Sequence, residues 1–199
     1  MKHTLMILTA SLLILSSCSS NRAFTKGEYT DPDRVILLDD RYNESDMKIM
    51  ADALVDSLMK NKIITAAKGA PVFQVETVSN STDEHIDMQS LTDKIRTALI
   101  KSGKVQFHDK LQRKTLSDEY SYQTESGNVN KETAKGKGHQ VGADYILAGD
   151  FASNVQELGG KKVIYYKLTL NATDIKTGLI TWTEEKAIKK LFKKRSYAL

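Results

Sequence analysis

The chain contains a single cysteine, Cys18, which ends an apolar segment near the N-terminus. A disulfide within the chain needs a second cysteine, and the sequence has none. A metal site needs several ligands close together, and His3 is the only histidine near this cysteine. What remains is chemistry at the sulfur itself, because a thiolate is a nucleophile. The residues before Cys18 indicate which chemistry that is.

These preceding residues have the layout of a secretory signal. Lys2 gives a positive start, residues 5–15 are mostly apolar, and residues 16–17 are small. The apolar stretch is far shorter than the ~20 residues that cross a bilayer as a helix. Residues 15–18, Leu-Ser-Ser-Cys, resemble the bacterial lipobox, in which the sulfur is diacylated, the chain is cut before the cysteine, and the new amino group is acylated. The alternative is an ordinary signal peptide with a chance cysteine.

Lipidation of Cys18 would make a durable anchor, since each buried methylene of an acyl chain contributes ~0.8 kcal/mol. Ser19 follows the cysteine, where inner-membrane lipoproteins of enteric-type bacteria usually carry aspartate. We therefore expect a protein anchored in the outer membrane, with its folded part facing the periplasm.

Two other patterns could in principle do chemistry. Residues 136–142, Gly-Lys-Gly-His-Gln-Val-Gly, resemble a phosphate-binding loop only faintly, because a strand should precede the glycines and here a strand is predicted after them. The carboxylate pairs 118–119 and 184–185 are adjacent in sequence, so in a regular element they do not converge as an acid and a base. Nucleotide binding is therefore not expected, and the carboxylate pairs are typical of solvated surface.

His85 lies among acidic residues at 83, 84 and 87, which could suggest a metal site. No second histidine stands at helical spacing from it, and carboxylates near a helix start are explained by capping and by the helix dipole. His108 and His139 belong to no motif. We therefore expect no enzyme, no metal site and no cofactor.

The formal net charge is +4 at pH 7, and the excess is uneven because Lys186, Lys189, Lys190, Lys193, Lys194 and Arg195 crowd the C-terminus. Basic clusters can bind nucleic acid, but an exported lipoprotein rarely meets any, so no nucleic-acid partner is expected. Anionic lipid head groups, cell-wall polymers and an acidic protein face remain as partners, and a solvated tail without a partner is the alternative.

The chain divides into four parts by pattern. Residues 1–17 are the signal peptide, residues 18–41 the lipidated cysteine and a flexible tether, residues 42–190 one globular domain, and residues 191–199 a basic C-terminal tail. The tether shows neither helical nor strand periodicity and would reach about 70 Å at ~3.1 Å per residue.

Two amphipathic helices are predicted in the domain. Asn43 caps the first, and the apolar stripe that follows is Met47, Met50, Leu54 and Leu58. Asp87 caps the second, and its buried stripe is Leu91, Ile95, Ala98 and Leu99. Residues 110–141 look helical but are broken by Gly127, Gly136 and Gly138.

Strands are predicted at 71–78, 105–107 and 143–151, with a polar loop at 79–85. The clearest strand is 164–172, where apolar residues alternate strictly with Tyr165, Lys167, Thr169 and Asn171. A turn at 174–178 leads to a partner strand at 179–183. The fold class expected is α+β: a single small domain with a mixed or antiparallel sheet of four to five strands packed by helices, preceded by the flexible tether.

The order of these segments resembles the LpoB family, outer-membrane lipoproteins that activate penicillin-binding proteins. The resemblance is carried by residues 73–80, 91–104, 141–147 and 168–182, and includes the blocks Val-Gly-Ala-Asp-Tyr and Lys-Thr-Gly-Leu-Ile-Thr-Trp. Related domains occur in the curli-secretion lipoprotein and at the start of TolB-like proteins. A structural or secretion-related lipoprotein that uses the same domain is therefore the alternative function.

The resemblance implies a partner rather than a substrate: the small regulatory domain of a bifunctional class A penicillin-binding protein. It implies a contact face near the segment before the third strand, that strand's outer end and the final hairpin. On this chain the corresponding residues are Lys135, Lys137, His139, Ala148, Lys176 and Leu179. The alternative is that these lysines are simply solvated and that Leu179 packs inward beside Trp182. A monomer is expected, and the tether departs from the family's long proline-rich linkers because Pro32 is its only proline.

Overall fold

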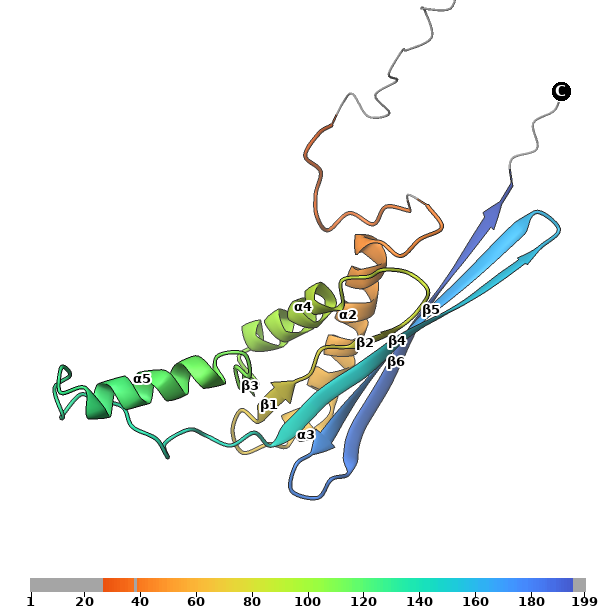
Figure 1. Cartoon of the computed structure of the whole chain (residues 1–199). Coiled ribbons are helices and arrows are strands. Elements are labelled where there is room, and N and C mark those ends of the chain that lie inside the picture. Colours follow the sequence, from red (N-terminus) through yellow and green to blue (C-terminus); the bar gives the residue numbers. More distant parts are fainter. Residues whose placement is uncertain (1–26, 38, 195–199) are drawn as a thin grey trace, which may run out of the picture. The chain divides into compact units, whose positions relative to one another are not determined.

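The computed structural model describes residues 27–37 and 39–194 (Figure 1). The chain divides into two compact units, 1–34 and 35–199. In the first unit, the described residues form a turn in which the Asp31 carboxylate accepts the Asp33 N–H at 2.8 Å. The second unit contains all the helices and strands that follow here, and each unit is treated by itself.

The first three helices of the second unit are α2 (Glu44–Lys60), α3 (Lys62–Thr65) and α4 (Met88–Lys101). The predicted caps are confirmed. Asn43 and Asp46 form a reciprocal capping box, each side chain accepting the other's backbone N–H, and the Asp87 carboxylate accepts the Ser90 N–H. Such a cap contributes about 0.5–2 kcal/mol to helix stability.

The sheet is mixed and runs in the order β3-β1-β4-β5-β6. Its strands are β1 (Val72–Val75), β3 (Gln106–Phe107), β4 (Tyr145–Leu158), β5 (Lys161–Asp174) and β6 (Ile180–Lys193). β1 pairs in parallel with β3 and β4, whereas β4, β5 and β6 form an antiparallel meander. The predicted α+β class is confirmed. The short β2 (Ser79–Ser81), which also pairs with β4, lies in the segment expected to be a loop.

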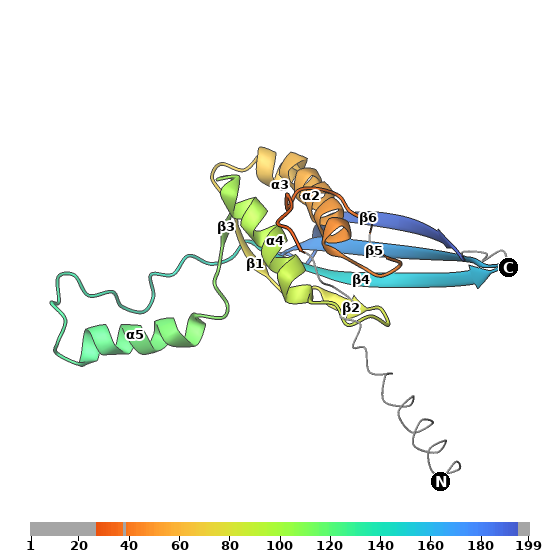
Figure 2. The ribbon, with the colours of Figure 1, turned by 90° about the horizontal axis from the view of Figure 1, so that it is seen from above.

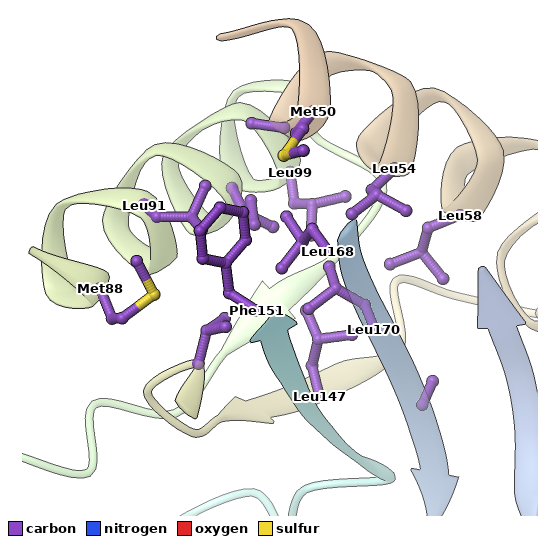
Figure 3. Packing of buried hydrophobic residues seen from close by; sticks show 14 of the residues in the cluster. Met50, Leu54, Leu58, Met88, Leu91, Leu99, Leu147, Phe151, Leu168 and Leu170 are labelled. Atoms are coloured by element: carbon purple, nitrogen blue, oxygen red, sulfur yellow. The ribbon is translucent and has the colours of Figure 1, made fainter. Parts of the chain in front are cut away.

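The core lies between α2 and α4 and one face of the sheet (Figure 3). Side chains from both helices meet side chains of β4 and β5 there: Met50, Leu54, Leu58, Met88, Leu91, Leu99, Leu147, Phe151, Leu168 and Leu170. The predicted alternation in β5 is confirmed, since Ile164, Tyr166, Leu168, Leu170 and Ala172 are all buried. Every residue of this core cluster lies between 42 and 192, so a chain that begins at Ser19 keeps the whole core and is expected to fold on its own.

The last strands extend farther than their apolar patterns predict. β4 continues to Leu158 beyond the predicted end at 151, and β6 continues to Lys193 beyond the predicted ends of the strand at 183 and of the domain at 190. In these extensions many side chains on both faces are exposed. A backbone ladder needs no apolar stripe, so hydrophobic periodicity cannot mark where it stops.

The second unit begins at Val35, before the predicted domain start at 42, and Ile36, Asp40 and Arg41 contact the fold. The Ile36 N–H donates to Ser45 Oγ at 2.8 Å, and Lys162 Nζ donates to Asp40 Oδ2 at 2.7 Å, which lowers the pKa of Asp40. Lys190 Nζ donates to the Arg41 carbonyl oxygen at 2.7 Å. This end of the predicted tether is thereby attached to β5 and β6.

Candidate partner-binding surfaces

An arm of the chain, residues 108–143, runs between β3 and β4 and carries α5 (Arg113–Glu125), which has no buried residue (Figure 2). Helix α5 ends before Gly127, whose φ of +75° favours glycine, as the predicted break requires. At the base of the arm, His108 Nε2 hydrogen-bonds with the Val141 carbonyl oxygen. This hydrogen bond joins the two ends of the arm.

The arm is attached to β1 by polar contacts rather than by a core. Lys110 Nζ lies 2.6 Å from Glu76 Oε2, and Arg113 donates to the side-chain oxygen of Gln74. The hydrogen bond from Lys110, reinforced by the Gln74 amide, lowers the pKa of Glu76. Half-exposed ion pairs of this kind contribute at most about 1 kcal/mol. The arm is therefore a weakly packed, solvent-exposed element.

Three of the sequence-predicted residues lie on this arm, and all three side chains are exposed. The Lys135 N–H donates to Gln123 Oε1 at 2.7 Å, which fixes the returning chain against α5. Lys137 lines a small open groove together with Arg113 and Tyr120. His139 follows it in the same exposed segment.

A second groove lies at the turn between β5 and β6, next to the point where the arm joins β4. It has a volume of about 620 Å³, and its charged lining residues are Lys62, Lys68, Asp144, Asp174 and Lys176. The Ile175 N–H donates to the Asp144 carbonyl oxygen at 2.9 Å, which ties the turn to the end of the arm. The Asp174 carboxylate accepts the Thr177 N–H at 2.8 Å, and this hydrogen bond lowers the pKa of Asp174.

The same turn exposes apolar side chains. Leu179 is 65% exposed, and its neighbours Ile180 and Ile175 are 59% and 47% exposed. Trp182 is buried by contrast, so Leu179 does not pack inward beside it. A cluster of exposed large apolar residues in a turn is a feature of surfaces that contact another protein.

Ala148, the last of the six residues, lies elsewhere. It pairs with Asn171 across the β4–β5 ladder, on the sheet face opposite Leu147 and the helices, and is half-buried. The structure thus divides the six residues among the arm, the turn and the open sheet face. The groove at the turn contains Lys176 but none of Lys135, Lys137 and His139.

Sequence reasoning missed several residues of these surfaces. Lys62 and Lys68 reach the groove at the turn from the connection between α2 and β1, far away in sequence, and only the tertiary fold reveals this. Ile175 and Ile180 did give a signal, because an apolar residue stands on each side of the Lys-Thr-Gly turn.

A further groove lies where α2 begins, lined by Tyr42, Asp83, Glu84 and His85 among others. The Tyr166 hydroxyl donates to Glu84, whereas the Tyr42 hydroxyl is buried without a partner among the described residues. Burial raises the pKa of Tyr42. Within the described ranges no group of three metal-ligating side chains occurs, and none of the helices there is long and apolar enough to span a membrane.

The fold and these surfaces define an α+β domain with open lysine-bearing grooves and an exposed apolar turn, features suited to binding another macromolecule. The family model described as peptidoglycan-synthase activator LpoB matches residues 46–188, and the chain therefore belongs to the LpoB family. This match confirms the resemblance seen in the sequence.

The solved structures that match the chain include members of this family. The LpoB C-terminal domain from Escherichia coli is 19% identical with a TM-score of 0.45, and the one from Salmonella enterica is 18% identical with a TM-score of 0.42; each comparison covers 73% of this chain and 99% of the other. Lipoprotein GNA1162 from Neisseria meningitidis is 12% identical, with a TM-score of 0.38 over 60% of this chain and 83% of the other. No curated protein matches the sequence.

Proposed function

We propose that this chain is a lipid-anchored outer-membrane protein that binds the regulatory domain of a class A penicillin-binding protein and stimulates its synthesis of peptidoglycan. The supporting observation is the family match over residues 46–188, which spans the helices and nearly all of the sheet. The activity is allosteric rather than catalytic. The chain must bind the active conformation of the enzyme more tightly than the inactive one, and only that difference in affinity shifts the equilibrium.

The experiment that tests this function combines capture with reconstitution. The full lipidated chain, solubilised with the envelope in detergent, is expected to recover a class A penicillin-binding protein. The purified pair is then expected to polymerise glycan strands faster than the enzyme alone. Recovery of an export apparatus instead, with no stimulation, would assign the chain to secretion and contradict the proposal.

The anchor depends on Cys18, which lies outside the described residues. Cys18→Ser removes the sulfur that would be acylated, so the variant is expected to incorporate no labelled palmitate and to remain an uncleaved or mis-sorted precursor. The measurement is palmitate labelling of the wild-type and variant chains in cells. Equal labelling of both would show that the lipid is attached elsewhere.

The proposed binding surface includes the arm and the turn between β5 and β6, and its cations attract an acidic partner. Exposed charges at an interface rim mainly raise the association rate. The double variant Lys137→Glu and Lys176→Glu is therefore expected to activate the enzyme less than the wild type, with the larger loss at low salt, because salt already screens the wild-type attraction.

The measurement is glycan polymerisation at two ionic strengths. The matched control is Lys101→Glu and Lys104→Glu, which changes the net charge equally at exposed positions around the end of α4. Full activation by the folded Lys137/Lys176 variant at low salt would place the binding surface elsewhere.

A further inference from the structure

The antiparallel strands β4, β5 and β6 present one face to the helices and leave the other face open. Their register places alternate residues on the open face in rows that cross all three strands. In the outermost row, Leu158 lies beside Lys161, which lies beside Lys193. Two rows farther in, Tyr165 lies beside Lys189. We call this outer end of the open face the distal strip.

The distal strip combines exposed apolar side chains with cations. Leu158 is 87% exposed, Leu191 54% and Tyr165 37%. The remaining positions of its three rows, Asn154, Gln156 and Val163, carry no charge, so Lys161, Lys189 and Lys193 give the strip three positive charges and no negative one.

The neighbouring acidic groups are already paired with other lysines. Asp40 and Glu157 both contact Lys162, whose side chain is on the helical face, at 2.7 Å and 3.7 Å. Glu185 lies 3.5 Å from Lys167, beyond the strip on the open face. Among the described residues, no ion pair involves Lys161, Lys189 or Lys193. The positive charge of the strip is therefore available to a partner.

The place of the strip in the fold favours the membrane as its partner. Figures 1 and 2 show this end of the three strands projecting beyond the helices. It is also the end at which the N-terminal segment joins the fold, through the contacts of Asp40 with Lys162 and of Arg41 with Lys190. A chain anchored at Cys18 would hold this end within about 70 Å of the membrane, since an extended residue spans ~3.1 Å.

We infer that the distal strip docks on the surface of an anionic phospholipid bilayer. The three lysines contact lipid phosphates, while Leu158 and Leu191 enter the boundary between head groups and acyl chains and Tyr165 lies at head-group level. This inference rests on the proposed function, because the lipid anchor at Cys18 keeps the strip close to the bilayer and so raises its effective concentration there. The docked domain is thereby held close to the membrane.

The test uses the chain from Ser19 onward, which lacks the signal and the anchor but keeps the whole core. Its binding is measured by co-sedimentation with vesicles of phosphatidylglycerol and phosphatidylethanolamine, and with vesicles of phosphatidylcholine. Binding is expected to the anionic vesicles alone and to weaken with salt.

Each lysine near an anionic surface raises partitioning about fivefold. The triple variant Lys161→Gln, Lys189→Gln and Lys193→Gln is therefore expected to bind roughly a hundredfold less. The control variant Lys101→Gln, Lys104→Gln and Lys131→Gln loses the same charge at exposed sites outside the strip and is expected to bind nearly as well as the wild type. Leu158→Ser with Leu191→Ser is expected to weaken binding while leaving the salt dependence unchanged.

Three results would overturn the inference: equal binding by the triple variant and the control variant, equal binding of the wild type to both vesicle types, or unchanged binding by the leucine variant. Self-association that the triple variant abolishes, seen by analytical ultracentrifugation without lipid, would assign the strip to contact between copies instead. The vesicle assay contains no penicillin-binding protein, so its failure leaves the proposed activation standing. If the wild type binds anionic vesicles but fails to stimulate the purified enzyme, the proposed activation is refuted and the docking of the distal strip stands.

Discussion

Replacing Lys190 with methionine is expected to lower the free energy of unfolding by about 3–5 kcal/mol. Lys190 Nζ lies 2.5 Å from Asp46 Oδ2, and the two side chains are only 3% and 7% exposed. The same ammonium donates to the Arg41 carbonyl oxygen. Methionine fills a similar volume but leaves the Asp46 carboxylate buried without a counter-charge, and this uncompensated charge causes most of the loss.

Two further variants separate charge burial from loss of contact. In Lys190→Met with Asp46→Asn no buried charge remains, and the amide oxygen of Asn can still accept the Asn43 N–H, so most of the lost stability is expected to return. Lys60→Met removes an ion pair of the same 2.5 Å length whose side chains are 73% and 63% exposed, and is expected to cost less than about 1 kcal/mol.

Chemical denaturation of the wild type and the three variants measures these differences in the free energy of unfolding. A loss below about 1 kcal/mol for Lys190→Met would show that the carboxylate remains hydrated in the folded protein and that the pair is not a buried one.

Lys190 illustrates where the sequence stops being informative. It belongs to the basic run that suggests a solvated tail or a partner-binding segment. In the structure its place in the β6 ladder, opposite Ile164, turns it toward the helices, whereas Lys189 faces the open side. Lys189 and Lys190 both follow the alternation of side chains between the two faces of a strand. The alternation of apolar residues, which would reveal this in the sequence, ends before residue 184. Only the register with β5 determines which lysine is buried.

The parts of the fold that could be predicted are those specified by local physics. Asn43 and Asp87 satisfy backbone N–H groups within three residues of themselves, and β5 is buried on one face throughout most of its length. The attachment of Ile36, Asp40 and Arg41 could not be predicted, because their hydrogen bonds and ion pairs join polar groups that carry no pattern in the sequence. Such pairings are specified by the tertiary fold.

The candidate binding surfaces follow the same division. The sequence left two alternatives for Leu179, exposed or packed beside Trp182, and only the structure shows that it is exposed. The groove at the turn is lined by three segments that are distant in sequence and contain Lys62, Asp144 and Lys176. Only the tertiary fold brings these segments together. The distal strip likewise depends on strand extensions that hydrophobic periodicity does not mark.

Replacing Leu168 with alanine is expected to cost about 2–5 kcal/mol, the range for deleting a fully buried leucine side chain. Leu168 is 0% exposed, lies opposite Phe151 in the β4–β5 ladder, and contributes to the core below α2 and α4 (Figure 3). The cost has two parts: the transfer energy of the lost methyl groups, and a cavity that close-packed neighbours fill only in part.

The matched control is Thr169→Ala, one residue along the same strand but on the open face, where the expected cost is below about 1 kcal/mol. Thermal or urea unfolding of the chain from Ser19 onward measures both variants. Because a shift of one residue in register exchanges the two faces of a strand, the ratio of the two costs reports which face of β5 is buried. Equal costs for the two variants, or a cost for Leu168→Ala below about half a kcal/mol, would mean that β5 does not present Leu168 to the helices.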